Sequence, residues 1–312
     1  MEKINNLKPN NVYNLNFLVE RVHEAISANG KTYLVLTAKD NTGTIDCRIW
    51  EVNEKIQSLV KKGAILNGDF NVISYRNALQ AKVVKIKEVD DKSVKLDDFV
   101  MLAPINVDEY MKIIYDTIND FEDADYKKLM LKVLKKHEKH FSKWPAALKV
   151  HHALKHGLLM HTTDMLNNAK FIANYYKNID INKDLLFAGV ILHDFGKILE
   201  IDENSVDFTI GGKLIAHISL MVSELQTFSE YQKMDITKQN LLSHMIIASH
   251  GKKEFGSPVE PAIIEAELLS IIDNLDAKLF IINQELKNVE VNNQTKPIKY
   301  LENRFFYKHY KK

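Results

Sequence analysis

The sequence predicts a two-part α+β chain, in which a small five-stranded β-barrel precedes an all-α bundle of helices. Hydrophobicity over the first 90 residues follows the strand period, whereas beyond residue 106 apolar residues recur with the helical period. The length of 312 residues corresponds to about two domains. We expect a barrel domain over 1–90, a linker and helical connector over 91–145, the main helical domain over 146–290, and a basic and aromatic tail over 291–312.

The composition is that of an ordinary soluble protein, with 46% hydrophobic and 27% charged residues. The formal net charge is only +1, so any contact with nucleic acid must come from local basic patches. The single cysteine, Cys47, excludes an internal disulfide and fits a reducing compartment. No apolar run approaches the roughly 18 residues of a membrane span, and the N-terminus lacks an apolar signal segment. We therefore expect a cytoplasmic protein without a membrane partner.

Five strands are expected in the first domain, interrupted by two turns and one short helix. Asn29-Gly30 is a strong hairpin signal, and the stretch from Asp40 to Gly43 is a second turn. The expected strands are 12–22, 31–37, 44–50, 65–73 and 81–89, with the helix at 52–60. This order outlines a barrel of the OB type, and it resembles the nucleic-acid-binding OB domains attached to RNA enzymes.

Aromatic and basic side chains on these strands are the candidates for contact with nucleic acid. OB domains bind single strands by stacking bases on aromatic rings in a basic groove. The candidates are Tyr33, Arg48, Trp50, Tyr75 and Arg76. Aromatic residues on a barrel strand also serve as core, and the sequence leaves that alternative open.

Metal-binding side chains recur at the ends of apolar helical stretches in the second half. The apolar run 185–192 ends in His193-Asp194 and is broken at Gly196. Further candidates on other helical segments are His161, His217, His244, His250 and Asp273. Helices that each direct one or two such side chains inward commonly form a metal site in an all-α core. Imidazole and carboxylate donors suit Mn, Fe, Zn or Mg, and the absence of thiolates argues against a structural zinc.

The order and local sequence of these residues match the motifs of the HD phosphohydrolase superfamily. The matching stretches are Gly157-Leu-Leu-Met-His161, His193-Asp194-Phe-Gly-Lys197, Ala216-His217, Ser249-His250-Gly251 and Ile272-Asp273-Asn-Leu-Asp276. An OB domain, a helical linker and an HD domain of this length resemble the YhaM-type 3′→5′ exoribonucleases of Gram-positive bacteria. The resemblance covers nearly the whole chain.

The resemblance implies a role for each matching residue. The metal-binding core would be His161, His193, Asp194 and Asp273, with Asp194 between the ions when two are bound. His217 and His250 would hold a second ion, and His244 is a further candidate that could equally pack its helix. Lys197 would meet a phosphate oxygen and join Asp194 as a catalytic residue, although a lysine there can also cap helix carbonyls. His151 and His152 either contact phosphate or lie in a solvated turn.

Two positions depart from the family pattern. Ser249 stands where the family has the first histidine of a pair, which leaves open whether one or two ions are bound. Met160 replaces an acidic residue beside His161, a change that affects packing more than chemistry.

The function implied is a metal-dependent 3′→5′ exonuclease acting on single-stranded RNA, with single-stranded DNA as a second substrate class. Hydrolysis would use a metal-activated water. The expected cofactor is a divalent metal, one or two ions, with Mn²⁺ first and Co²⁺, Fe²⁺, Mg²⁺ or Zn²⁺ as alternatives. A homo-oligomer is left open.

Two rival functions remain. The first is an HD phosphohydrolase or phosphodiesterase acting on a small nucleotide, for which an OB domain would be superfluous. Residues 255–258 also lack the Gly-Tyr-Pro element of the cyclic-dinucleotide enzymes. The second rival is a non-catalytic single-strand-binding protein with a vestigial HD domain, and the retained metal-binding core argues against it.

The tail interleaves basic and aromatic residues, among them Arg304, Phe305, Phe306 and Tyr307. These side chains could line a groove for the substrate strand. The alternative, which we favour slightly at this point, is that they dock the C-terminus on the helical domain.

Overall fold

The computed structural model describes residues 2–75, 78–89, 94, 96–147, 154–202, 207–287 and 289–310. It contains two compact units, one ending at Leu102 and the other beginning at Ala103. Each unit has its own hydrophobic core. Among the described residues, no helix combines the length and apolar character needed to cross a membrane.

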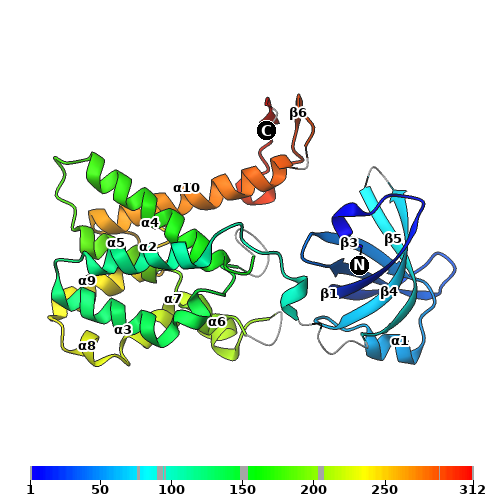
Figure 1. Cartoon of the computed structure of the whole chain (residues 1–312), viewed down its shortest axis with the longest axis horizontal. Helices are drawn as coiled ribbons and strands as arrows, with labels where there is room; N and C mark the ends of the chain where they lie inside the picture. The colour runs from blue at the N-terminus through cyan, green and yellow to red at the C-terminus, as the bar shows by residue number, and fades with distance from the viewer. Residues whose placement is uncertain are drawn as a thin grey trace. The chain divides into compact units, whose positions relative to one another are not determined.

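The first unit is a closed five-stranded barrel with the strand order β1-β2-β3-β5-β4, closed by pairing of β4 with β1 (Figure 1). All neighbours are antiparallel except β3 and β5, which are parallel. The strands are β1 (Val12–Ile26), β2 (Thr32–Lys39), β3 (Thr44–Ile49), β4 (Ile65–Tyr75) and β5 (Ala78–Glu88), with helix α1 (Glu54–Leu59) between β3 and β4. This is an OB-type barrel, and the predicted fold class is confirmed.

The turns that join these strands form for local reasons. Gly30 has φ +73°, a conformation that glycine adopts without steric cost, and the turn it completes lets β1 and β2 pair. Asp40 accepts hydrogen bonds from the backbone of Thr42 and Gly43, closing an Asx turn. Asn53 caps α1 by accepting from the Ile56 amide. The short polar turns predicted from the sequence therefore set the register of the barrel.

The interior of the barrel is filled by side chains that alternate along each strand. Phe17 and Phe70 meet edge to face with ring centroids 5.1 Å apart. Cys47 is buried in the same core, and burial raises the pKa of its thiol above the ordinary value. The alternate side chains of β2 and β3 are left on the outer face, where they can meet a ligand.

The second unit is helical, as its sequence period predicts. Its helices are α2 (Val107–Asn119), α3 (Ala124–Phe141), α4 (Gly157–Tyr175), α5 (Lys183–Leu192), α6 (Lys197–Glu200), α7 (Ile210–Leu225), α8 (Ser229–Gln232), α9 (Ile236–Ile247) and α10 (Ile264–Lys287). Asn106 caps α2, and Asp123 and Asn182 cap α3 and α5. A two-stranded hairpin of β6 (Asn293–Gln294) and β7 (Tyr307–Lys308) follows α10 (Figure 1).

Helix α5 lies at the centre of this unit and packs against α4, α9 and α10. Helix α5 has ten residues, and six of them, all between Leu185 and Leu192, have buried apolar side chains. A seventh buried residue, Gly189, allows α9 to pack closely against α5. A Cβ at Gly189 would lie 2.5 Å from the Met245 side chain, so only glycine permits this separation. The sequence that ends α5, His193-Asp194, is therefore held in the middle of the helical core.

Candidate metal centre

The end of α5 fixes His193 through two backbone contacts. The His193 amide donates to the Gly189 carbonyl, and its ring Nδ1 lies 2.7 Å from the Val190 carbonyl oxygen. A carbonyl can only accept, so Nδ1 carries the proton and Nε2 presents a lone pair. Nε2 points toward His161 on α4, with 3.3 Å between the two Nε2 atoms. These two backbone contacts thus leave Nε2 of His193 as the atom that could bind a metal.

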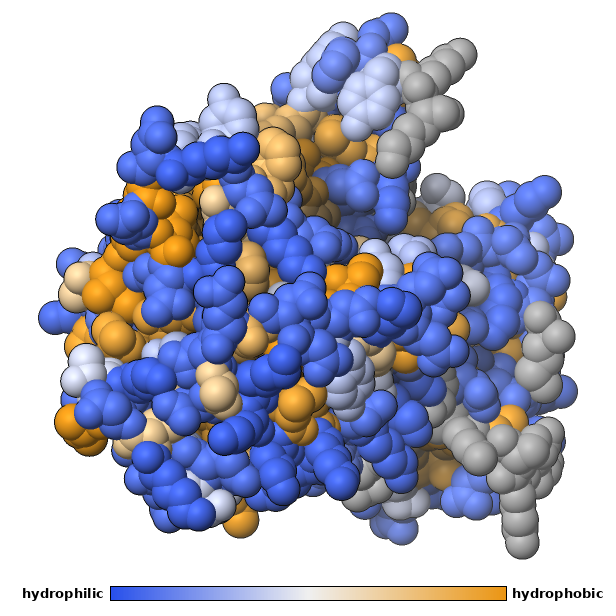
Figure 2. Space-filling view, turned by 60° about the vertical axis from the view of Figure 1, so that its left-hand side comes forward, coloured by the Kyte–Doolittle hydropathy of each residue, from blue (hydrophilic) through white to orange (hydrophobic). Residues whose placement is uncertain are grey.

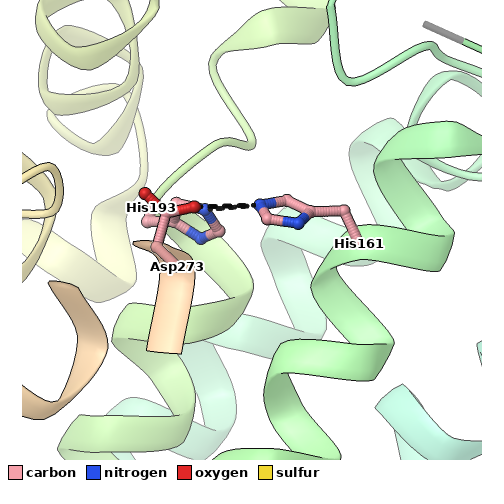
Figure 3. A group of neighbouring side chains, drawn as sticks. All are labelled: His161, His193 and Asp273. Atoms are coloured by element: carbon pink, nitrogen blue, oxygen red, sulfur yellow. Dashed lines mark hydrogen bonds and ion pairs between the residues drawn. The ribbon is translucent and has the colours of Figure 1, made fainter. Parts of the chain in front are cut away.

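His161, His193 and Asp273 form the first candidate ligand group, drawn from α4, the end of α5 and α10 (Figure 3). Their donor atoms all lie within 4.8 Å of one another. His161 Nε2 is 3.4 Å from Asp273 Oδ1, and both histidines are fully buried. Figure 3 shows the two imidazoles and the carboxylate converging on one point.

Asp194, His217 and His250 form the second candidate group under the same 4.8 Å criterion. His217 lies on α7, and His250 lies just after α9, with ring centroids 5.5 Å apart. His250 Nδ1 donates to the Phe255 carbonyl at 3.0 Å, which leaves Nε2 as its donor atom.

Asp194 connects the two groups through its two carboxylate oxygens. Oδ2 lies 3.6 Å from Nε2 of both His161 and His193. Oδ1 lies 3.4 Å from Nε2 of His217. One buried carboxylate therefore faces both clusters of imidazoles.

Two further carboxylates orient the histidines from behind. Asp276 Oδ2 lies 2.7 Å from Nδ1 of His161. Glu200 Oε1 lies 3.2 Å from Nδ1 of His217 and also accepts the His217 amide at 3.0 Å. Carboxylates in this position fix the tautomer of a ligating histidine and increase its basicity. The arrangement leaves Nε2 of each ring to face Asp194.

The backbone around His217 is shaped for this contact. Ala216 has φ 58° and ψ 168°, a region that is essentially restricted to glycine and costs of order 1–3 kcal/mol for other residues. A Cβ at Gly196 would lie 2.1 Å from the His217 carbonyl oxygen, and one at Gly212 would lie 2.2 Å from the Glu200 carbonyl oxygen. Two glycines and one strained alanine thus bring His217 and Glu200 together.

The electrostatics of the centre favour bound positive charge. Burial alone would raise the pKa of Asp194, but Lys197 and the surrounding histidines outweigh it and hold the pKa well below its usual range. Burial would lower the pKa of His161, but hydrogen bonds to Asp273 and Asp276 raise it to about 10. Ionised carboxylates therefore face the imidazoles from several sides.

The donor set also passes a test of fit for a cation. Among the described residues, Asp194 Oδ1 and His217 Nε2 are buried polar atoms without a hydrogen-bond partner. Orphaned buried polar atoms are rare because each costs free energy. A divalent cation coordinated by both would satisfy them, and imidazole with carboxylate is a common donor set for such ions.

Other residues singled out in the sequence lie in different surroundings. Lys197 begins α6, and its ammonium lies 2.5 Å from Asp194 Oδ2. It therefore lies beside the second residue that was expected to be catalytic. His244 is in neither ligand group, because its Nε2 accepts the Ala262 amide at 2.9 Å. Ser249 is fully buried, and its hydroxyl has no partner within the described residues. His151 and His152 lie outside the described residues.

The outer face of the barrel brings most of the nucleic-acid candidates together. Tyr33 and Trp50 stack with centroids 4.4 Å apart and planes at 19°. Arg48 donates to Gln80 across β3 and β5 at 2.8 Å. Arg48 also lines a groove of about 270 Å³, together with Arg21, His23, Thr37, Asp46 and Gln80.

Tyr75 lies at the end of β4 and is 48% exposed, whereas Arg76 is outside the described residues. The stacked pair and Arg48 are outer-face residues, not core. Arg21 and His23 were missed in the sequence, and alternation along β1 is the signal that could have found them.

The sequence model of the HD domain family matches residues 158–278, the part that carries both ligand groups. The chain is 38% identical over 293 residues to the 3′-5′ exoribonuclease YhaM of Bacillus subtilis, covering 93% of each chain. It is 37% identical to YhaM of Geobacillus sp. strain WCH70, covering 93% of this chain and 90% of the relative. This chain belongs to the YhaM family.

A solved structure is similar to the barrel alone. The second OB-fold domain of replication protein A from Methanococcus maripaludis is 28% identical, with a TM-score of 0.24. The match covers 29% of this chain and 96% of the replication protein A domain. The YhaM relatives, in contrast, match both units.

Proposed function

We propose that this protein is a metal-dependent 3′→5′ exoribonuclease that hydrolyses phosphodiester bonds of single-stranded RNA, with single-stranded DNA as a second substrate class. The observation that carries the proposal is the pair of His/Asp ligand groups joined by Asp194. The relatives named 3′-5′ exoribonuclease support the reaction and its direction, since they match 93% of the chain. The barrel, with its stacked Tyr33–Trp50 pair, supplies a surface suited to unpaired bases.

His161, His193 and Asp273 would hold one divalent ion, and His217 and His250 a second, with Asp194 between them. When bound, the ions would lower the pKa of a water and stabilise charge on the phosphate. We propose Mn²⁺ as the ion. The donors would be imidazole and carboxylate, which also accept Fe, Zn or Mg, and the single cysteine, Cys47, lies in the barrel core and offers them no thiolate. Cys47 also supports a reducing, cytoplasmic location.

The protein's own residues orient the reaction. Asp276 and Glu200 hold Nδ1 of His161 and His217, which keeps their Nε2 atoms facing Asp194, where the ions would bind. Lys197 lies beside Asp194 and would pair with a phosphate oxygen once the ligand groups are neutralised. The buried setting of Asp194 strengthens each of these electrostatic contacts by lowering the local dielectric.

A small nucleotide substrate would use the same ligand groups but would not need the barrel. The exposed aromatic pair and the groove at Arg48 have no role in that alternative. We therefore favour an oligonucleotide substrate.

The test uses a 5′-labelled single-stranded RNA with Mn²⁺ or with EDTA. We expect a ladder that shortens from the 3′ end with Mn²⁺ and no cleavage with EDTA. Asp194→Ala should reduce the rate at least 1,000-fold, on the order of the effect of losing a group that stabilises transition-state charge. Asp180→Ala, at an exposed aspartate outside both ligand groups, is the matched control and should leave the rate unchanged. Intact RNA with hydrolysis of mononucleotides would contradict the proposal.

A further inference from the structure

The C-terminal segment concentrates positive charge. Residues 291–312 contain six Lys and Arg side chains and one Glu, a net charge of +5 in a chain whose total is +1. The same segment contains five Tyr and Phe residues. The remainder of the chain is therefore net negative, and this segment is one local attraction for a polyanion.

The described part of this segment is an ordered hairpin seated on α10. Asn293 and Gln294 pair with Lys308 and Tyr307, and a bridge joins Ile298 to Arg304. The aliphatic side chains Ile298 and Leu301 are buried, whereas Arg304, Phe305 and Tyr307, for which docking was slightly favoured over a groove for the strand, are exposed. The hairpin is thus anchored by its aliphatic residues.

Four of the five aromatic side chains are left on the outside, whereas Phe306 is half-buried, with the Arg304 guanidinium 5.5 Å from its ring centroid. The exposed fractions are 63% for Tyr300, 55% for Phe305, 56% for Tyr307 and 41% for Tyr310. Exposed basic residues, Lys296, Lys299 and Arg304, alternate with them along the chain. In Figure 2 the hairpin is the projection at the top of the helical unit, where hydrophilic residues lie beside pale aromatic rings. Several exposed aromatic rings gathered in one place form an apolar surface of the kind that marks an interaction site.

We propose that this hairpin is a second single-strand RNA-binding surface, which holds the part of the substrate upstream of the scissile bond. The proposal rests on the proposed exoribonuclease function. Bases of any sequence can stack on exposed rings while lysine and arginine pair with phosphates. The net charge of +5 is complementary to a polyphosphate backbone, and an anionic membrane or a protein partner is an outcome that the experiments below distinguish.

Helix α10 sets the distance between this surface and the candidate metal centre. It carries Asp273 of the first ligand group and continues to Lys287, immediately before the hairpin segment (Figure 1). Fourteen residues of helix span about 21 Å at 1.5 Å per residue. At about 3.4 Å per stacked nucleotide, this is roughly six nucleotides. The hairpin should therefore contribute only to substrates longer than that.

The first experiment removes the rings from the full-length protein. We compare wild type, Tyr300→Ala/Phe305→Ala/Tyr307→Ala, and the control Phe171→Ala/Tyr175→Ala, which removes two similarly exposed rings from α4. The Kd of a fluorescein-labelled 12-nucleotide RNA is measured by anisotropy in EDTA. We expect at least ten-fold weaker binding for the hairpin variant and less than two-fold for the control, with unchanged thermal unfolding of both. Equal affinities of wild type and the hairpin variant would overturn the proposal.

The second experiment removes charge and varies substrate length. Lys296→Gln/Lys299→Gln should lower the slope of log K against log salt by about 1.4, since each phosphate contact on a single strand contributes about 0.7. With Mn²⁺, both hairpin variants should lose kcat/KM on the 12-nucleotide RNA and keep it on a 4-nucleotide RNA. An unchanged slope, or equal losses on both lengths, would overturn the proposal, as would hairpin variants that change only sedimentation or binding to anionic vesicles.

These results also separate the two proposals. If wild type cleaves no RNA but the hairpin variants lose RNA binding, the proposed function fails and the binding surface stands. If wild type cleaves RNA and the hairpin variants bind and cleave as it does, the binding surface fails alone.

Discussion

Glu200 contacts His217 twice and touches no other candidate ligand. Its Oε1 accepts both the His217 amide and its ring Nδ1. Asp276 makes the corresponding contact with His161 in the first ligand group. Each group therefore has its own orienting carboxylate, which means that the two groups can be perturbed separately.

Glu200→Gln should weaken Mn²⁺ binding to the second group and spare the first. An amide can still accept the Nδ1 proton but lacks the charge that raises imidazole basicity, so we expect about 10–100-fold lower affinity for one of two ions. Titration followed by electron paramagnetic resonance of free Mn²⁺ measures each affinity. Excess Mn²⁺ should restore the activity, and Glu200→Asp should restore part of the affinity.

Asp276→Asn is the reciprocal variant, since it should affect the ion at His161 instead. A two-bond ¹⁵N–¹H correlation spectrum of the metal-free protein reports the tautomer of each histidine ring. A general packing role of Glu200 would not change that tautomer. The spectrum should show the Nδ1-protonated form of His217 in wild type and a mixture of tautomers in Glu200→Gln, because a Gln amide can either accept from Nδ1 or donate to it. Equal weakening of both ions by both variants would contradict separate positioning roles.

At the scale of elements, one ion-pair cluster joins α3 to α7. Glu224 on α7 lies 2.6 Å from Lys136 Nζ and 2.8 Å from His137 Nε2 on α3. Burial alone would raise the pKa of Glu224, but the hydrogen bonds from Lys136 and His137 outweigh it and lower that pKa. Because α7 also carries His217, this contact supports the helix that positions the second ligand group.

The lowered pKa predicts a pH dependence of stability. The folded pKa lies below the unfolded one, about 4.3, so the stabilisation is fully present above that value and is lost as the pH falls through the folded pKa. Glu224→Gln should cost about 1 kcal/mol at pH 7, since solvent screens a partly exposed pair. Urea unfolding in EDTA at pH 7 and pH 3 measures this, and the difference from wild type should be smaller at pH 3 than at pH 7. A cost that is the same at both pH values would show that the charge of Glu224 is not its source.

Element type followed from the sequence wherever periodicity and turn chemistry agreed. The turns at Gly30 and Asp40 formed as predicted, because each depends on neighbours in the chain. Strand β1 runs to Ile26, beyond its predicted end at Val22, because pairing with β2 extends to Thr32. Such pairing is a tertiary contact, which local pattern does not contain.

In the candidate metal centre, too, the motif residues could be predicted from the sequence and the tertiary contacts could not. The motif residues His161, His193, Asp194 and Asp273 come together as the family resemblance implied, although their roles remain proposals. Glu200 was missed because it lies in a four-residue helix with no motif, and its role arises only when the chain bends at Ala216. For His244 the sequence left a ligand role and a packing role open, and local pattern does not contain the contact in which its ring accepts the Ala262 amide.

At the scale of the whole molecule, the two units have separate cores, so we expect them to unfold separately. The chain carries its own probe for this. Cys47, the only cysteine, is buried in the barrel core, so its reaction with a thiol reagent reports barrel unfolding. Circular dichroism at the helix band reports mainly the helical unit.

Mn²⁺ at 100 times its Kd should stabilise the helical unit by about 2.7 kcal/mol, since the ion binds the folded ligand groups and not the unfolded chain. In urea titrations, the helical transition should move to higher urea while the midpoint of Cys47 labelling stays unchanged. Asp194→Ala should abolish the shift, because it removes the carboxylate shared by both groups. A metal-induced shift of both transitions together would mean that the barrel and the helical unit unfold as one cooperative body, and the separate cores would then not behave as separate units.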